Sequence, residues 1–192
     1  RPAPHAALIM AFPAFLDTNV LYGAVLADTL LRVAEAGAYR PHWSADVLSE
    51  LSRNLVQHAG LSPEKAAHRI EQMEQAFPDA SVAGYDGLID GLGCDPKDRH
   101  VLAAAIHGGC QVIVTFNTKD FPPESVEGFG ITVVPPQDFL LDQLDLYPRL
   151  VRDALQAQAA TSNRPELSYP QVLGRLRRAG VVVGAGSSAG SP

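Results

Sequence analysis

Hydrophobic and polar positions along the chain form short segments that predict strands and helices in turn. Apolar runs at residues 12–17, 39–43, 110–114 and 131–134 have the length of buried strands, and residues 81–83 fit a short edge strand. Between them, apolar side chains recur at helical spacing. This order of elements predicts an α/β fold of three layers, with helices on both faces of a central parallel sheet.

Start and stop signals place the helices between these strands. A first helix is predicted to open at Asp28 and Thr29 and to end at Gly37, and a second is capped by Ser44 and ends at Gly60. A third helix opens at Ser62-Pro63-Glu64 and ends at Pro78. A fourth opens at Asp95-Pro96 and ends at Gly108.

The pattern changes near residue 142, which divides the chain into two predicted parts. Residues 10–141 carry the alternating strands and helices, and residues 142–182 are predicted to form a helical extension. In the extension, Leu144 to Ala160 is predicted to be one helix and Gln171 to Ala179 a second. Residues 1–9 and 183–192 lack periodicity and are predicted to be disordered, with Met10 as the native start.

Composition narrows the class of protein and its surroundings. Hydrophobic residues make up 46% of the chain, without an apolar run long enough to span a membrane, so we expect a globular protein and no membrane partner. Cys94 and Cys110 are too few for a disulfide framework and lack zinc-site spacing, which favours a cytoplasmic protein. The net charge of −6 argues against broad charge-driven binding of nucleic acid.

Carboxylates follow several of the predicted strands and helix starts. Asp17 ends the first strand, Glu50 lies beside the buried stripe of the second helix, Asp98 follows a helix opening, and Asp120 follows the strand at 110–114. The carboxyl ends of parallel strands meet at one sheet edge, so these groups are expected to lie together. An alternative remains for Asp95 and Asp98, because two acids at a helix start are also explained as a capping pair.

A cluster of carboxylates at one edge suits hard divalent cations. Mg²⁺ and Mn²⁺ prefer oxygen ligands, and the bound ion relieves the repulsion among the acids and inverts their local charge. Such an ion lowers the pKa of a bound water and neutralises charge on a phosphodiester. The sequence therefore predicts a site for Mg²⁺ or Mn²⁺ with hydrolytic chemistry.

Four motifs together resemble those of PIN domains, most of all the VapC-type toxins of bacterial toxin–antitoxin pairs. They are residues 17–20 (DTNV), the helical Glu50, residues 98–105 (DRHVLAAA) and residues 114–121 (VTFNTKDF), in order over about residues 10–140. The resemblance implies a PIN-like domain, an Mg²⁺- or Mn²⁺-dependent endoribonuclease that cleaves RNA, inhibition by a cognate antitoxin, and a homodimer.

By position, the resemblance assigns the catalytic and metal-binding acids to Asp17, Glu50, Asp98 and Asp120. Many family members have an Asp where this chain has Asn117, so either Asp120 completes the site or the site has three acids. The polar groups expected to orient the acids are Asn19, Thr115, Asn117 and Asp95. The candidate RNA-binding cations are Arg99, Lys97, Lys119 and Arg53.

Two other functions remain open on sequence grounds. The DTNV motif also resembles that of haloacid dehalogenase-like phosphatases, but Asn19 stands where that chemistry needs a general acid. A catalytically weak PIN-like module that acts through protein or RNA partners is the second alternative. His100 is interpreted as a core or surface histidine, and Trp43 as a core residue.

Overall fold

The computed structural model of the chain describes residues 11–161, 168–178 and 180–181. The predictions of disorder for residues 1–9 and 183–192, and most of the polar link near residue 165, lie outside these residues.

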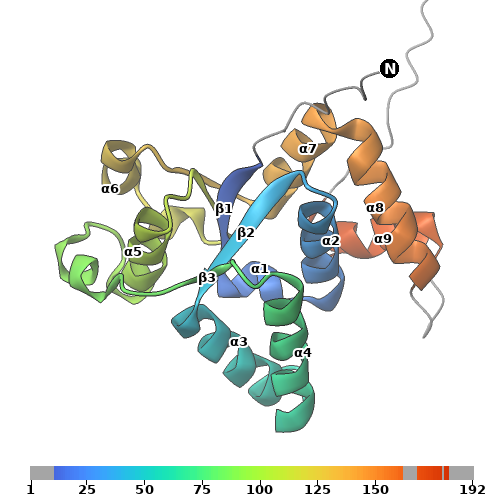
Figure 1. Cartoon of the computed structure of the whole chain (residues 1–192), viewed down its shortest axis with the longest axis horizontal. Helices are drawn as coiled ribbons and strands as arrows, with labels where there is room; N and C mark the ends of the chain where they lie inside the picture. The colour runs from blue at the N-terminus through green and yellow to red at the C-terminus, as the bar shows by residue number, and fades with distance from the viewer. Residues whose placement is uncertain (1–10, 162–167, 179, 182–192) are drawn as a thin grey trace, which may run out of the picture.

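Five parallel strands form one sheet in the order β3-β2-β1-β4-β5 (Figure 1). They are β1 Phe12–Leu16, β2 Tyr39–Ser44, β3 Ser81–Val82, β4 Val112–Val114 and β5 Thr132–Val134. The strand order reverses direction between β1 and β4, where open parallel sheets hold their ligands at the carboxyl ends. The predicted strands and the short edge strand are confirmed.

The helices cover both faces of this sheet. Figure 1 shows α5 on one side and α2 with α7 on the other, whereas α3 and α4 lie beyond the carboxyl ends of the strands. The α-helices are α1 Thr18–Tyr22, α2 Ala24–Glu35, α3 Ala45–Gln57, α4 Pro63–Ala76, α5 Arg99–His107, α6 Pro123–Val126, α7 Pro136–Leu146, α8 Pro148–Thr161 and α9 Tyr169–Arg178. The 3₁₀ turns are η1 Asp86–Gly91, η2 Pro96–Asp98, η3 Thr118–Asp120 and η4 Glu127–Phe129. The predicted three-layer α/β fold with a helical C-terminal region is confirmed.

The core lies on both faces of the central strands. Phe15 and Leu16 of β1 are fully buried, as expected for a strand covered on two sides. Tyr39 of β2 packs edge-on against Phe139 of α7 with ring centroids 4.8 Å apart. Trp43 is fully buried, which confirms its interpretation as a core residue.

Local capping chemistry explains where two helices begin. Ser44 accepts a hydrogen bond from the backbone N–H of Val47 at 3.3 Å, and Ser62 does the same for Lys65 at 3.3 Å. Each serine satisfies a backbone donor that has no partner inside its helix. The predicted starts of α3 and α4 are therefore confirmed.

Three predicted helix boundaries were wrong. Asp95-Pro96 opens the 3₁₀ turn η2, and the α-helix α5 begins only at Arg99. The first helix does not open at Asp28: α2 begins at Ala24, and Asp28 pairs inside it with Arg32 at 2.9 Å, one turn later. The stretch from Leu144 to Ala160 is not one helix, because α7 ends at Leu146 and α8 begins at Pro148, whose ring and missing N–H break the ladder. The division proposed near residue 142 falls inside α7.

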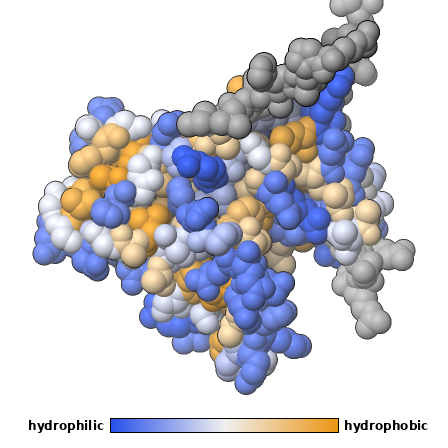
Figure 2. Space-filling view, viewed as in Figure 1, coloured by the Kyte–Doolittle hydropathy of each residue, from blue (hydrophilic) through white to orange (hydrophobic). Residues whose placement is uncertain are grey.

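Hydrophilic and hydrophobic residues are unevenly distributed over the surface of the molecule. Figure 2 shows hydrophilic residues over α3 and α4, and hydrophobic ones gathered on the side where α5 and α6 lie. In the part of the chain that the structure describes, no helix is both long and apolar enough to cross a membrane.

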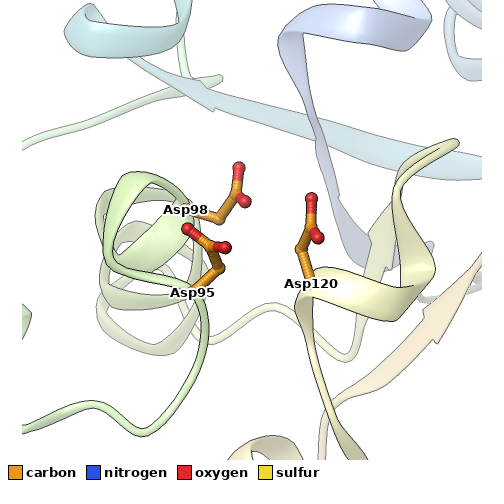
Figure 3. Close-up of side chains that lie close together, drawn as sticks. All are labelled: Asp95, Asp98 and Asp120. Atoms are coloured by element: carbon orange, nitrogen blue, oxygen red, sulfur yellow. The ribbon is translucent and has the colours of Figure 1, made fainter.

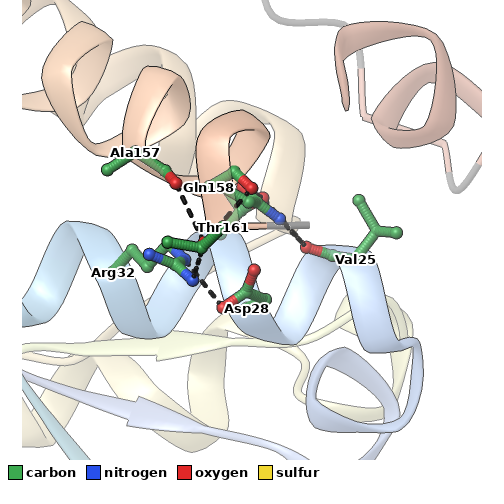
Figure 4. A network of polar contacts seen from close by, with 7 residues as sticks. Val25, Asp28, Arg32, Ala157, Gln158 and Thr161 are labelled. Atoms are coloured by element: carbon green, nitrogen blue, oxygen red, sulfur yellow. Dashed lines mark hydrogen bonds and ion pairs between the residues drawn. The ribbon is translucent and has the colours of Figure 1, made fainter. Parts of the chain in front are cut away.

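Helix α8, in the C-terminal helical region, contacts α2 through buried polar groups as well as apolar ones (Figure 4). Gln158 is 3% exposed; its Oε1 accepts from the Thr29 hydroxyl at 2.7 Å, and its Nε2 donates to the Val25 carbonyl at 3.1 Å. At the end of the helix, Arg32 donates to the Thr161 hydroxyl at 2.7 Å. Buried polar groups of this kind favour one register of α8 on α2.

Replacing Gln158 by Leu is expected to destabilise the protein by about 1 kcal/mol, because the Thr29 hydroxyl and the Val25 carbonyl each lose one buried hydrogen bond and keep only the 2.9 Å bond between them. Chemical denaturation measures the free energy of unfolding. Gln156→Leu, on an exposed position of the same helix, is the matched control and should change it little. Equal stability of the two variants would show that the contacts of Gln158 do not stabilise this interface.

Candidate active site

Asp17 comes to the carboxyl edge of the sheet because it directly follows the buried strand β1. Its carboxylate is 5% exposed and accepts three hydrogen bonds of 2.7 Å, from the backbone N–H of Thr18, the Asn19 amide and the Thr115 hydroxyl. Burial nevertheless raises the pKa of Asp17, and these hydrogen bonds oppose the shift. The carboxylate is thus fixed in direction while its charge is only partly compensated.

Asn19 and Thr115 each make three side-chain hydrogen bonds that hold this arrangement. The Asn19 amide donates to Asp17 and to Thr115 Oγ1 at 2.9 Å, while its Oδ1 accepts from the Phe116 N–H at 3.0 Å. Thr115 Oγ1 also accepts from the Asn117 N–H at 3.0 Å. These contacts join the ends of β1 and β4, and they support the predicted orienting roles of Asn19 and Thr115.

Glu50 extends from α3 toward the same edge. Its Oε2 accepts from the Thr18 hydroxyl at 3.1 Å, and Thr18 follows Asp17 in the chain. The predicted position of Glu50, beside the buried stripe of α3 and facing the sheet edge, agrees with this contact.

Asp98 does not act as a helix cap. It occupies the N-cap position of α5 without a side-chain capping bond, whereas Asp95 accepts from the Lys97 N–H at 3.1 Å. The Asp98 residue is 9% exposed, and its buried Oδ2 has no hydrogen-bond partner among the described residues. Capping therefore accounts for Asp95 and leaves Asp98 unexplained.

The surroundings of Asp98 favour its neutral form. Burial, followed by the nearby charge of Asp17, raises its pKa to about 7, and the ammonium of Lys97 opposes the shift. Carboxylates at a functional site are often perturbed in this way.

A second group of acids shares Asp98 with the first. Asp95, Asp98 and Asp120 each offer an oxygen within 4.8 Å of the others, from two segments that Figure 3 shows facing each other. A backbone hydrogen bond of 3.1 Å from Asp95 N–H to the Asp120 carbonyl ties these segments together. Lys97 Nζ lies 3.2 Å from Asp120 Oδ2 and 3.9 Å from Asp98 Oδ2. Asp95, predicted to orient other ligands, is thus placed where its own carboxylate could be a ligand.

A cavity of about 740 Å³ brings three of the predicted acids together. The described residues that line it are Asp17, Thr18, Asn19, Tyr22, Glu50, Arg53, Asn54, His58, Lys97, Asp98, His100 and Asn117. Asp120 is not among them and is connected to the cavity through Asp98. Asn117, the position where many family members have an acid, is among the residues that line the cavity.

The four candidate RNA-binding cations separate in the structure. Arg53 and Lys97 line the cavity, although Lys97 also pairs with Asp120. Arg99 and Lys119 are not among the lining residues; Arg99 instead donates to the Cys94 carbonyl at 3.5 Å. RNA binding by each of the four stays a prediction.

Sequence reasoning missed several residues of the cavity wall. His100 was interpreted as a core or surface histidine, but it lines the cavity, and its buried Nδ1 has no hydrogen-bond partner among the described residues. The role of Thr18 in holding Glu50 was also missed, although its hydroxyl at a strand end is the same signal that identified Thr115. Tyr22, Asn54 and His58 carry no comparable signal, because their position depends on how α1 and α3 pack.

Comparisons with known proteins agree with this geometry. A family model described as "PIN domain" matches residues 13–119, and one described as "VapC50 C-terminal domain" matches residues 136–187. A segment of 68 residues is 52% identical to a Mycobacterium tuberculosis (strain ATCC 25618 / H37Rv) protein named "Putative ribonuclease VapC50". That segment covers 35% of this chain and 40% of the relative's length.

The PIN-domain match spans more than half of the chain and contains Asp17, Glu50 and Asp98. The structure brings these three acids together at one cavity. The chain therefore belongs to the PIN-domain family.

Proposed function

We propose that this protein is a Mg²⁺- or Mn²⁺-dependent endoribonuclease that hydrolyses RNA phosphodiester bonds. The observation that carries the proposal is the convergence of Asp17, Glu50 and Asp98 on one cavity, with a buried Asp98 oxygen that has no hydrogen-bond partner among the described residues. Membership of the PIN family and the name of the mycobacterial relative point to the same activity.

The donor set fits a hard divalent cation. Asp17, Glu50 and Asp98 supply carboxylate oxygens on one side, and Asp120 and Asp95 supply further oxygens beyond Asp98. When bound, such an ion supplies Lewis-acid activation of water and neutralises charge that builds on the phosphate. The ion does not need all five acids as ligands. Asp98 belongs both to the cavity acids and to the cluster with Asp95 and Asp120.

The chain's own residues hold the acids in place. Thr18, Asn19 and Thr115 hold Glu50 and Asp17 by hydrogen bonds, so the carboxylates need little reordering when they bind an ion. Arg53 and Lys97 line the cavity, and we expect them to neutralise phosphates of a bound RNA.

We further propose that the protein is the toxin of a toxin–antitoxin pair, inhibited by a cognate antitoxin and dimeric. The VapC-type motifs and the match to the VapC50 C-terminal domain support this assignment. Co-purification with the protein encoded by the neighbouring gene would test the antitoxin, and light scattering would test the dimer.

The purified chain is expected to cleave structured RNA with Mn²⁺ or Mg²⁺ and not with EDTA. Mn²⁺ at a hundredfold excess over Kd should also raise the melting temperature by about 5–10 °C, because the ion binds only the folded acid cluster. Gel electrophoresis and differential scanning fluorimetry measure the two effects. Binding of Mn²⁺ without cleavage of any RNA tested would favour the alternative of a non-catalytic binding module, and absence of both would overturn the metal-dependent mechanism.

A further inference from the structure

The last turn of α9 carries three arginines within four residues, Arg175, Arg177 and Arg178. Val172 and Leu176 on the same helix are fully buried, and α9 packs against α8 and α2. Arg177 and Arg178 are exposed, and Arg175 is partly exposed. Among the described residues, none of the three forms a salt bridge with a carboxylate.

The end of α9 is held in a defined position. The Gly180 N–H donates to the Arg177 carbonyl at 3.1 Å, and the Val181 N–H donates to the Leu176 carbonyl at 2.8 Å. Gly180 has φ of +83°, and Val181 is fully buried. These are the features of a Schellman motif, in which the glycine adopts a left-handed conformation and the next residue anchors the chain. The arginines therefore project from a fixed turn.

This turn lies beside Phe116, which is hydrogen-bonded to Asn19 of the cavity wall. A Cβ atom built on Gly180 would lie 3.7 Å from Cε1 of Phe116, so the two residues are neighbours. Phe116 is 42% exposed, its N–H donates to Asn19 at 3.0 Å, and Asn19 contacts the Asp17 carboxylate at 2.7 Å. One residue, Asn19, thus connects Phe116 to the acid at the end of β1.

We propose that Phe116, Arg175, Arg177 and Arg178 form a binding surface for single-stranded RNA that leads into the cavity. We call it the Arg–Phe surface. The inference rests on the proposed ribonuclease function and assigns the helical extension a part in holding the substrate.

Charge and shape both favour RNA as the occupant. The chain has a net charge of −6 and an acidic cavity, so the phosphates of an approaching strand need local cations before they reach the acids. Phe116 exposes an aromatic ring beside the turn that follows the arginines, and unpaired bases stack on such rings while guanidinium groups bind the backbone. The competing explanation is structural, since arginines in a last turn also stabilise the helix dipole.

The test is the affinity of the full chain for a fluorescein-labelled oligouridylate, measured by fluorescence anisotropy in EDTA so that the RNA stays intact. Arg177→Gln with Arg178→Gln is expected to weaken binding about tenfold and to reduce the slope of log K against log salt by about 1.4, the value for two lost phosphate contacts. Phe116→Leu should weaken binding about fivefold or more through lost stacking. The matched control is Arg149→Gln with Arg152→Gln, at exposed positions of α8, which should bind like the wild type.

Each outcome decides the inference separately from the catalytic proposal. Loss of binding in the Arg177/Arg178 and Phe116 variants supports the Arg–Phe surface even if no RNA is cleaved with Mn²⁺. Unchanged affinity in these variants overturns it even if the wild type is an active ribonuclease. If the affinity is unchanged and the melting temperature falls, the arginines stabilise the helix instead of binding RNA. If the affinity and the melting temperature are both unchanged, the inference is also overturned, and an acidic protein becomes the partner to test. A wild type without affinity for the oligouridylate overturns the inference as well.

Discussion

Replacing Asp98 by Asn is expected to abolish metal-dependent cleavage while the protein remains folded. Asp98 is shared by the cavity acids and by the group with Asp95 and Asp120, so its loss affects both possible ligand sets. Asn keeps the size of the side chain but removes the charge that attracts a divalent cation. The stabilisation by Mn²⁺ should therefore be lost together with cleavage.

The same substitution should make the protein more stable at neutral pH when no divalent ion is present. The pKa of Asp98 is raised to about 7 in the folded protein, mainly by burial and then by the charge of Asp17. A raised pKa means that the folded protein binds the Asp98 proton more tightly than the unfolded chain does. The contribution of Asp98 to the stability of the folded protein is therefore fully present below about pH 4 and is lost as the pH rises through about 7. Because solvent partly screens the group, we expect a gain of about 1 kcal/mol at pH 8, or ~2–4 °C, in Asp98→Asn.

Thermal unfolding with EDTA between pH 4 and 8 measures this effect in the wild type and in Asp98→Asn. The curves should lie close together near pH 4 and separate toward pH 8, with the variant more stable. Asp153→Asn, at an exposed position of α8, is the control and should retain cleavage, Mn²⁺ stabilisation and the wild-type pH dependence. If Asp98→Asn is unfolded at all pH values, Asp98 itself would have the structural role of a helix cap, which the structure assigns to Asp95.

Replacing Thr115 by Val is expected to cost about 2–3 kcal/mol of stability and to reduce cleavage 10- to 100-fold. Thr115 is fully buried; its hydroxyl donates to Asp17 and accepts from Asn19 and the Asn117 N–H. Valine has the same shape but leaves these three groups without that partner. The Asp17 carboxylate then loses a contact that sets its direction.

Denaturant unfolding and the ratio kcat/KM measure the two consequences. Thr132→Val, at an exposed position of strand β5, is the matched control and should change neither. The melting temperature of Thr115→Val should fall by about 4–10 °C. A stable variant with wild-type cleavage would show that Asp17 is held without the help of the Thr115 hydroxyl.

Much of the fold followed from features within a few neighbouring residues. The buried strand before Asp17 could be recognised from its apolar run, and the starts of α3 and α4 from Ser44 and Ser62, because capping involves residues only three positions apart. Errors arose where two local signals competed. Asp28 is of a residue type common at helix N-caps but lies within α2, where it pairs with Arg32. The apolar periodicity from Leu144 onward continues across the break between α7 and α8 at Pro148.

Sequence alone also determined which acids are available and that a parallel sheet would bring them to one edge. It could not decide which of them meet, because that depends on contacts between distant segments. Thr115 and Asp17 are joined across 98 positions because β4 pairs with β1.

Only the tertiary structure showed that Asp98 is left without a hydrogen-bond partner among the described residues, and that the end of α9 lies beside Phe116. The physical reason is that helix caps and strand periodicity are short-range effects, whereas desolvation, charge proximity and the position of the C-terminal helices arise from packing of the whole chain. The chemistry of this site was present in the sequence, and its geometry came from the fold.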